Sequence, residues 1–472
     1  MTTDLDVTST AFRLRRKFAE VAAAPAVTRL TRGGHAAAVA KVVASQCVRL
    51  KQPAAGVSRP LTALFLPKPG FTEDILASVG RDDRFGVVAL DRSLVKAMAT
   101  VFLPDDVDDN FYRNVADRYV DQMSAYRAFC HALWPHLRRR LGIDLVLSGN
   151  FSYFAEQELI AALQAHGTPF VAMHKECLKT PGLAPFFEYT YSSRKLPFRG
   201  SAITVYNNIE RDIQVAAQVA PPERITVTGM PRMDEIHRWR RAHAGQGTAA
   251  DGAPRVLFMS FNAGTGAPKI QHKGDRGWET LAPEFEGVSF EDLVTGTHAA
   301  MVNLARDNPD IRVAIKTKNH ATALKTIEQA FGRGFKPPAN LEFVIGGDPF
   351  ELIVGSDVMC AFNSTSLFEA LAAGIPIVQP MFDEAADPAR RPFVVELGAA
   401  ADQATSADEL NRMLAARARQ RASARIAAVL PAMSNEMLDH WVGNSDGLAG
   451  QRTCDLLADI ALGAEAPAAA SA

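Results

Sequence analysis

The sequence has few cysteines, and none of their spacings gives them a structural task. Cys47, Cys130, Cys177, Cys360 and Cys454 are an odd number of widely separated residues without a C-x-x-C pair. This spacing excludes a zinc site and a disulfide framework and is typical of reduced cytosolic thiols. No apolar run approaches the roughly 20 residues that span a bilayer, and no apolar segment with a small-residue cleavage site opens the chain. We therefore expect a soluble, cytoplasmic protein.

Neither sign of charge dominates the chain. The 51 basic and 52 acidic side chains nearly cancel, so no whole-molecule field marks a nucleic-acid partner. Residues 1–60 differ, because ten Lys and Arg stand there against three Asp and Glu. The cluster Arg13, Arg15, Arg16 and Lys17 is compatible with peripheral contact with anionic lipid headgroups at the inner face of the membrane. It is also compatible with a solvated helix face, which is the usual role of a charge run, and both interpretations stay open.

Short apolar runs alternate with helical stretches in two blocks. A chain of 472 residues is too long for one ordinary core, so two large domains are expected. The runs of the first block are 61–66, 87–90, 144–150, 169–176, 202–208 and 224–228. Those of the second block are 256–261, 313–319, 341–347, 357–363 and 375–380. Strands that alternate with helices predict an α/β protein with two Rossmann-like, doubly wound parallel sheets.

The Ala- and Gly-rich segment 242–254 indicates a flexible boundary between the two blocks. From Phe111 apolar residues recur every three or four positions, which predicts a long helix that Gly142 ends. The expected units are an N-terminal helical extension (1–58), a first domain (59–240), a second domain (254–405), C-terminal helices (406–463) and a disordered tail (464–472). We expect the C-terminal helices to pack across the interface between the domains.

The segment FNSTSLFEALAAGIPIVQP at 362–380 has the strongest functional pattern. Its polar residues Asn363, Ser364, Thr365 and Ser366 stand where a strand stops and a helix starts. Free backbone N–H groups, hydroxyls and the positive end of the helix dipole converge at such a point and bind phosphate. Glu369 follows one turn later, within reach of a ribose hydroxyl pair. The simpler alternative is that Ser364 only caps the helix.

Two further segments of the second block are candidates for the same site. Lys316, Lys318 and His320 lie at the end of the strand 313–319, and paired ammonium groups there could neutralise a diphosphate. The loop 262–269 offers Gly264, Thr265 and Gly266, because glycine lets a backbone approach a phosphate closely. Exposed lysines and short glycine loops are common, so neither segment is specific alone.

Together these motifs resemble a known group of enzymes. The residues Ser364, Thr365, Glu369, Ala373, Gly374 and Pro376 resemble the donor-site motif of GT-B glycosyltransferases and of UDP-N-acetylglucosamine 2-epimerases. DLVLSGNFS and PFVAMHKE are similar to the epimerase strands that end in Gly-Asp-Thr and His-Val-Glu-Ala-Gly. RITVTGMPRMDEI at 224–236 resembles the Val-Thr-Gly-Asn-Pro stretch of both groups and of bacterial surface-polysaccharide and teichoic-acid transferases. The motif order covers about residues 140–380.

The resemblance implies a GT-B fold with a cleft between its two domains. It further implies a nucleotide-sugar donor and a glycan or lipid-linked glycan acceptor. No cofactor and no metal are implied, because cationic side chains and helix dipoles can replace a metal in such enzymes. The base of a GT-B enzyme usually comes from the N-terminal domain, which makes His174 and Glu176 the catalytic candidates and puts Asn150 and Lys175 on the acceptor side. Asp383 and Glu384 either accept hydrogen bonds from sugar hydroxyls or only solvate a loop.

The sequence also departs from the epimerase pattern. Asn150 replaces the acidic residue, and the segment His174-Lys175-Glu176 loses the Ala-Gly-Leu-Arg that should follow. Abstraction of a sugar C2 proton needs placed acid and base groups, so the missing carboxylate favours glycosyl transfer. A UDP-N-acetylhexosamine 2-epimerase and a non-catalytic nucleotide-binding protein of the same fold remain the alternatives.

Overall fold

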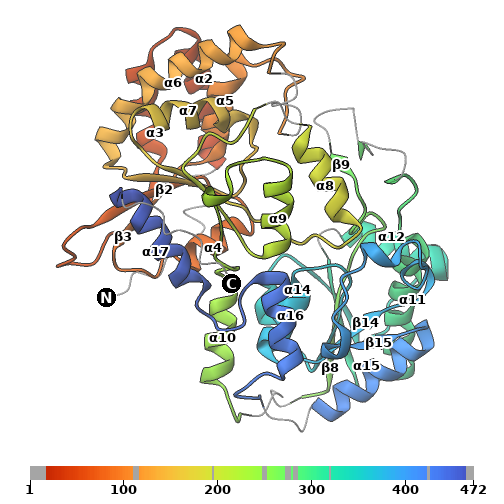
Figure 1. The fold of residues 1–472 in the computed structure, drawn as a ribbon. Helices are drawn as coiled ribbons and strands as arrows, with labels where there is room; N and C mark the ends of the chain where they lie inside the picture. The colour runs from red at the N-terminus through yellow and green to blue at the C-terminus, as the bar shows by residue number, and fades with distance from the viewer. Residues whose placement is uncertain are drawn as a thin grey trace.

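The computed structural model describes residues 17–109, 116–193, 196–246, 252–271, 278–279, 285–317, 320–421 and 426–463. They form two α/β domains, each built on one large, mostly parallel sheet (Figure 1). The predicted fold class, two doubly wound parallel-sheet domains with helices at both ends of the chain, is confirmed. The predictions for Arg13, Arg15, Arg16 and the tail 464–472 fall outside the described residues.

The first sheet has, among the described residues, seven strands in the order β1-β3-β2-β4-β5-β6-β7. The strands are β1 (Val48–Lys51), β2 (Leu61–Phe65), β3 (Phe85–Ala89), β4 (Leu145–Ser148), β5 (Phe170–Met173), β6 (Ala202–Val205) and β7 (Ile225–Val227). All neighbours pair in parallel except β1, which is antiparallel to β3. Nearly every residue of β2 to β6 is buried, as in parallel sheets covered on both faces. The strand order reverses between β2 and β4, which places the crevice of this domain at their carboxyl ends.

Helices lie on both sides of the first sheet (Figure 1). The helices of this half of the chain are the π-helical turn η1 (Ala19–Ala23), α2 (Ala24–Arg32), α3 (Ala36–Gln46), α4 (Phe71–Ala77), α5 (Arg92–Phe102), α6 (Val120–Leu141), α7 (Gln157–Ala165), α8 (Leu183–Ser192), α9 (Asn208–Ala216) and α10 (Met233–Ala242), of which α10 packs on α14 (Ser366–Ala373) of the second domain. The predicted long helix is α6; Gly142 ends it in the left-handed conformation, with φ 65°.

The N-terminal segment is part of the first domain's core. Helices α2 and α3 pack against α5 and α6, and Val27, Val39 and Val43 are fully buried there. The expectation that residues 1–58 contain no strand is wrong, because Val48–Lys51 forms the edge strand β1. Only four residues long and half-buried, this strand lacks the apolar run that identifies the inner strands.

The second sheet has six strands among the described residues, in the order β12-β11-β8-β13-β14-β15. The strands are β8 (Arg255–Met259), β11 (Arg312–Thr317), β12 (Leu341–Ile345), β13 (Val358–Cys360), β14 (Ile377–Pro380) and β15 (Asp402–Ala404). All pair in parallel. Numbered along the chain, this order is 3-2-1-4-5-6, that of dinucleotide-binding folds, and it reverses between β8 and β13.

The helices of the second domain are α11 (Glu291–Asp307), α12 (His320–Phe331), α13 (Pro349–Val354), α14 (Ser366–Ala373) and α15 (Ala407–Arg421). Helix α15 packs against α11 and β13 to β15 and so completes this domain. A short hairpin of β9 (Ile270–Gln271) and β10 (Trp278–Glu279) lies between β8 and α11.

The last two helices, α16 (Ala432–Val442) and α17 (Ala449–Leu462), carry the chain back to the first domain. Helix α16 packs on α14, whereas α17 lies beside the first sheet (Figure 1). Cys454 and Leu457 of α17 are buried there in a cluster with residues of β2 and β3. Between α16 and α17, Gly443 has φ 60°, and a Cβ atom on it would overlap the carbonyl of Tyr206. Only glycine permits this approach of two backbones.

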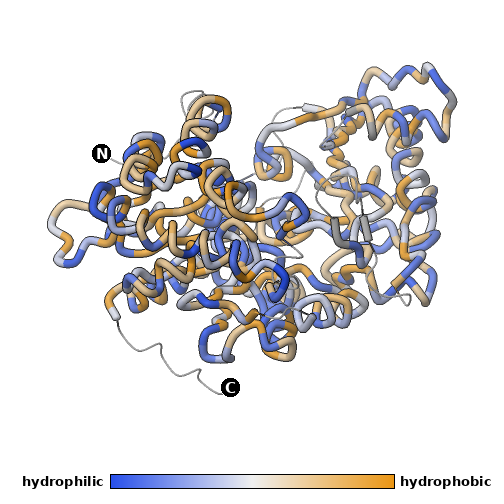
Figure 2. Tube along the Cα trace, turned by 90° about the horizontal axis from the view of Figure 1, so that it is seen from above, coloured by the Kyte–Doolittle hydropathy of each residue, from blue (hydrophilic) through white to orange (hydrophobic). Residues whose placement is uncertain are grey.

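Hydrophobic and hydrophilic residues alternate in short stretches along the trace (Figure 2). None of the helices in the described ranges combines the length and the apolar character that a membrane span requires.

Candidate functional site

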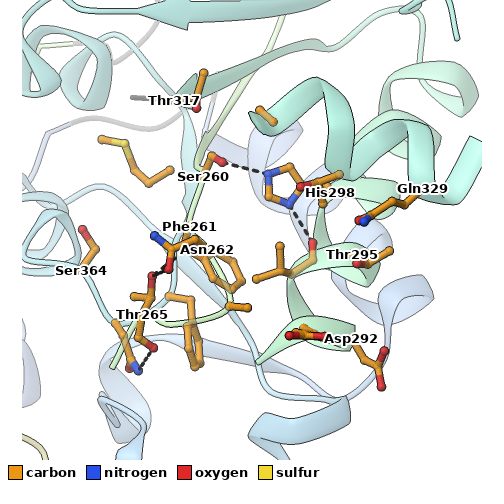
Figure 3. A pocket seen from close by; sticks show the side chains of 18 residues that line it. Ser260, Phe261, Asn262, Thr265, Asp292, Thr295, His298, Thr317, Gln329 and Ser364 are labelled. Carbon is orange, nitrogen blue, oxygen red and sulfur yellow. Dashed lines mark hydrogen bonds between the residues drawn. The ribbon is translucent and has the colours of Figure 1, made fainter. Parts of the chain in front are cut away.

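A cavity of about 770 Å³ lies at the carboxyl ends of β8, β11 and β13 (Figure 3). Its polar lining includes Ser260, Asn262, Thr265, Asp292, Thr295, His298, Thr317, Gln329 and Ser364. Strands β8 and β13 are the neighbours at which the strand order reverses, and ligands of open α/β sheets bind at this switch point. The lining residues all come from the second domain, so the interdomain cleft itself stays a prediction.

The amino end of α14 forms one wall of this cavity. The hydroxyl of Ser364 accepts hydrogen bonds from the backbone N–H (3.3 Å) and the hydroxyl (2.8 Å) of Ser366. Ser364 therefore caps the helix, as the simpler alternative predicts. Within the described part of the chain, neither its own hydroxyl proton nor the backbone N–H of Thr365 has an acceptor. Both can be donated to an anion in the cavity.

Asn363 joins three segments around the cavity. Its backbone is left-handed, with φ 45°, a conformation that asparagine tolerates better than most residues. Its amide donates to the carbonyl of Phe393 (2.9 Å) and accepts from the N–H of Val395 (2.7 Å). A Cβ atom on Gly266 would overlap the same amide. The side chain predicted to bind phosphate is thus engaged in holding loops together.

The loop 262–269 is closed on itself. The N–H of Gly264 donates to the side-chain oxygen of Asn262 (2.9 Å), and the N–H of Thr265 donates to the carbonyl of Asn262 (3.0 Å). Of the three residues predicted here, only Thr265 lines the cavity, whereas Gly264 and Gly266 shape the turn. The N–H groups of Gly264 and Thr265 are both used within the loop and are not available to a phosphate in this structure.

The predicted basic strand end meets the cavity differently from expectation. Thr317 lines the cavity, and Lys316, its neighbour on β11, does not, because successive strand residues point to opposite faces. Lys318 lies outside the described residues, and for His320 only the backbone at the start of α12 is described. The proposed pair of phosphate-binding lysines therefore stays a prediction.

Glu369 faces the first domain and does not line the cavity. Its carboxylate lies 3.8 Å from Nε of Arg232. Nη1 of the same arginine lies 3.1 Å and 3.2 Å from the two carboxylate oxygens of Asp74 and donates to Gly70 and Tyr206. Burial raises the pKa of Glu369, and the nearby arginine offsets only part of this effect. In this structure Glu369 takes part in an interdomain contact, and its predicted role at the ribose stays a prediction.

The two acidic residues after β14 have different surroundings. Both carboxylate oxygens of Glu384 accept backbone N–H groups at the start of α11, from Asp292 (2.8 Å) and Leu293 (2.7 Å). Glu384 thus caps a helix, a role that neither interpretation named, and its contact with a sugar stays a prediction. Asp383 has φ 46°, and its pKa is raised by burial and by the negative charges of Glu384 and Asp292.

The structure adds a pair of cavity residues that the sequence did not indicate. The hydroxyl of Ser260, just after β8, lies 2.9 Å from Nε2 of the buried His298 on α11, and Nδ1 of His298 lies 2.7 Å from the carbonyl of Val294 (Figure 3). Burial lowers the pKa of His298 to about 4, so the ring is neutral at pH 7. In the sequence, His298 is a single histidine in an amphipathic helix and gives no signal of a site.

In the first domain the catalytic candidate His174 is buried. Its Nε2 lies 3.1 Å from Glu210, and its ring packs 5.0 Å from that of Phe151. Burial opposes ionisation of Glu210, but Lys179 and His174 together hold its pKa below the usual value. This placement favours a structural role for His174 in the present conformation, and its role as a base stays a prediction.

Glu176 is accessible where His174 is not. Its side chain is 55% exposed and pairs with Lys175 at 2.9 Å. Burial of part of the group opposes ionisation, yet Lys175, Lys179 and His174 lower the pKa of Glu176 to about 2. Glu176 is therefore a carboxylate at all physiological pH values. Of the two catalytic candidates, it is the one that an acceptor can reach.

The remaining acceptor-side candidate completes a turn. The side-chain oxygen of Asn150 accepts the N–H and the hydroxyl of Ser152, both at 2.9 Å. Close by, the ring of Tyr153 lies 4.3 Å from the ammonium of Lys68 and 3.7 Å from the guanidinium of Arg92. Lys68 follows β2 and Arg92 follows β3, at the crevice of the first sheet. No motif in the sequence points to either residue.

Among the described residues, no group of three or more His, Cys, Asp and Glu side chains is placed to hold a metal ion. No protein-family model and no curated protein sequence matches the chain.

Several solved structures have a similar chain trace. One is a UDP-GlcNAc 2-epimerase from Methanocaldococcus jannaschii, with 10% identity, a TM-score of 0.47 and coverage of 84% of this chain and 99% of that one. Another is a variant of the wall teichoic acid polymerase TagF, with 12% identity, a TM-score of 0.45 and coverage of 96% and 99%. A third is the glycotransferase of kitacinnamycin, with 18% identity, a TM-score of 0.41 and coverage of 85% and 99%. Each of these likenesses concerns the chain trace alone.

Proposed function

We propose that this chain transfers a glycosyl group from a nucleotide-activated donor to a glycan or lipid-linked glycan acceptor. The cavity of the second domain supports this proposal most directly. It lies at the switch point of a sheet with dinucleotide-binding strand order, beside a helix amino end where the hydroxyl proton of Ser364 and the N–H of Thr365 have no acceptor among the described residues. A role in bacterial surface-polysaccharide synthesis is the part of the proposal that rests on the motif resemblance alone.

The acceptor side of the proposal rests on Glu176. A general base must be accessible and ionised, and Glu176 meets both conditions. A carboxylate with a pKa of about 2 is a weak base, so its ion pair with Lys175 has to open before it accepts a proton efficiently. An acceptor that displaces Lys175 would provide this change.

Epimerisation is the alternative to be tested against transfer. It requires placed acid and base groups at the sugar, and at the position of the epimerase acid this chain has Asn150, whose amide oxygen is engaged by Ser152. We therefore favour transfer.

A panel of UDP-, GDP-, CDP- and CMP-linked compounds tests the proposal by thermal shift. We expect one nucleotide class to raise the melting temperature selectively, because a ligand that binds only the folded state stabilises it by mass action. The selected nucleotide sugar is then incubated without acceptor. Slow hydrolysis agrees with a transferase, whereas conversion to the C2 epimer would establish an epimerase. Absence of binding across the panel would exclude both activities.

A further inference from the structure

The Ser260–His298 pair fixes the direction of one hydrogen bond inside the cavity. The carbonyl of Val294 can only accept, so Nδ1 of His298 carries a proton. Burial lowers the pKa of His298 to about 4, and the neutral ring therefore leaves Nε2 without a proton at pH 7. Nε2 must accept from Ser260, whose only hydroxyl proton is used in this bond. What Ser260 offers to the cavity is a pair of acceptor lone pairs.

We propose that the Ser260–His298 pair makes its wall of the cavity a hydrogen-bond acceptor for a hydroxyl or N–H group on the uncharged part of the ligand, and not for its phosphates. The inference rests on the proposed function, because it assigns the parts of a nucleotide sugar to different walls. Phosphate oxygens are themselves acceptors at neutral pH, so Ser260 has nothing to donate to them.

The carboxylates at the start of α11 reinforce this polarity. Glu291 and Asp292 line the cavity next to the helix amino end, a place where an anion would otherwise bind. The carboxylate of Glu384 already occupies the N–H groups there. A phosphate would meet the negative charge of these carboxylates there, whereas hydroxyl groups would find acceptors.

The wall formed by α14 has the opposite character. Ser364 retains its hydroxyl proton, and the N–H of Thr365 has no acceptor among the described residues. The cavity thus has hydrogen-bond donors on its α14 wall and hydrogen-bond acceptors on the wall formed by β8 and α11 (Figure 3). A diphosphate with a hydroxylated group attached matches this arrangement in one orientation only.

A serine beside a histidine also suggests a nucleophile, but the surroundings disfavour this role. Activation of a serine requires its histidine to take up a proton, and a carboxylate usually stabilises the resulting imidazolium. The partner of Nδ1 in His298 is the neutral carbonyl of Val294, and burial opposes the charged ring. The pair is therefore suited to orient a ligand.

Two matched variants, Ser260→Ala and Ser364→Ala, test the assignment by calorimetry. Each removes one hydroxyl from the same cavity. The probes are inorganic pyrophosphate, the nucleoside diphosphates UDP, GDP and CDP, and their glucose conjugates. Ser260→Ala should weaken the binding of a nucleotide probe by about 3- to 10-fold, which is the contribution of a neutral hydrogen bond. It should leave the affinity for pyrophosphate unchanged. Ser364→Ala should weaken pyrophosphate and the nucleotide probes alike, by about 10- to 100-fold, because its bond is to a charged group.

The probes also identify the bound group. If Ser260→Ala weakens binding of the nucleoside diphosphate, the Ser260–His298 wall binds the nucleoside. If the variant weakens binding of the glucose conjugate only, this wall binds the glycosyl group. Equal weakening of pyrophosphate by Ser260→Ala would overturn the inference, and so would no effect on any probe that binds the wild type. Should no probe bind the wild type, the proposed function fails and this inference fails with it.

A measurement without ligand distinguishes failure of the proposed function from failure of the hydrogen-bond assignment at Ser260 and His298. The ¹⁵N shifts of His298 should report an unprotonated Nε2 and a protonated Nδ1 at pH 7, and the Nε2 shift should change in Ser260→Ala. A proton on Nε2 would overturn the inference and leave the proposed function intact.

Discussion

At the scale of single residues, the site depends on partners that are distant in sequence. Ser260 and His298 are 38 positions apart, and Glu384 caps a helix through N–H groups that lie 91 and 92 residues before it. The sequence identified Ser364 because its partners are local, two residues away. It could not identify a histidine whose task is defined by a serine on another element. Contacts between neighbours in the sequence could be predicted, whereas contacts between distant elements could not.

Glu176→Gln tests the base on the acceptor side. We expect turnover to fall by about 10²- to 10⁴-fold with nucleotide affinity unchanged, because the amide cannot take up a proton. Transfer kinetics and calorimetry on the same preparations provide the two readouts. His174→Gln is the companion variant: a larger loss of turnover there, with an active Glu176→Gln, would move the base to His174.

The buried His298 predicts a pH dependence of stability. Its pKa is about 4 in the folded protein and 6.5 for an ordinary histidine, so below pH 6.5 the unfolded state binds the proton more readily. The free energy of unfolding should therefore fall between pH 6.5 and 4, by up to about 3 kcal/mol from this residue. Urea denaturation across this range compares the wild type with His298→Phe. If the slope is the same in both proteins, His298 is not the cause.

At the scale of elements, apolar runs predicted the inner strands correctly. Strands β2 to β6 are buried on both faces, and each overlaps a run recognised in the sequence, although β3 begins two residues before its run. The edge strands β1 and β15, with sequences VRLK and DQA, were missed because an edge strand needs less burial and shows no apolar run. Periodicity thus reveals the centre of a sheet better than its borders.

Helix α17 should contribute to the stability of the first domain. Leu457 is fully buried against this sheet, so Leu457→Ala should lower the free energy of unfolding by about 2–5 kcal/mol. Leu462→Ala on the same helix is the control, because its side chain is largely exposed and its loss should cost less than about 0.5 kcal/mol. Urea denaturation measures both. Equal effects would contradict the assignment of α17 to the first domain's core.

At the scale of the whole molecule, the composition and the two blocks of strands predicted two domains, but not how they meet. Arg232 follows β7 of the first domain and contacts Asp74 on α4 and Glu369 on α14 of the second. The sequence assigned Glu369 to a ligand because the motif is local, whereas its partner lies in the other domain. Such a contact follows from the arrangement of domains, which strand patterns do not encode.

Arg232→Met tests how much this arginine stabilises the fold. Loss of the guanidinium leaves the buried carboxylate of Asp74, which lies in the same domain, without its cation, and this should cost about 3 kcal/mol of unfolding free energy. Arg81→Met removes an exposed ion pair with Glu235 and should cost less than about 1 kcal/mol. Differential scanning calorimetry of both variants compares the losses. A small effect of Arg232→Met would mean that the contact does not stabilise the fold.

The return of the chain to the first domain has a consequence for its synthesis. A ribosome completes residues 61–227, which hold strands β2 to β7, long before it reaches α17. Domains commonly fold in the order in which they are made, yet here the cluster around β2 and β3 lacks Cys454 and Leu457 until the second domain has been made. The nascent first domain therefore exposes apolar side chains of this cluster throughout synthesis of the second, and a chain released before α17 keeps them uncovered.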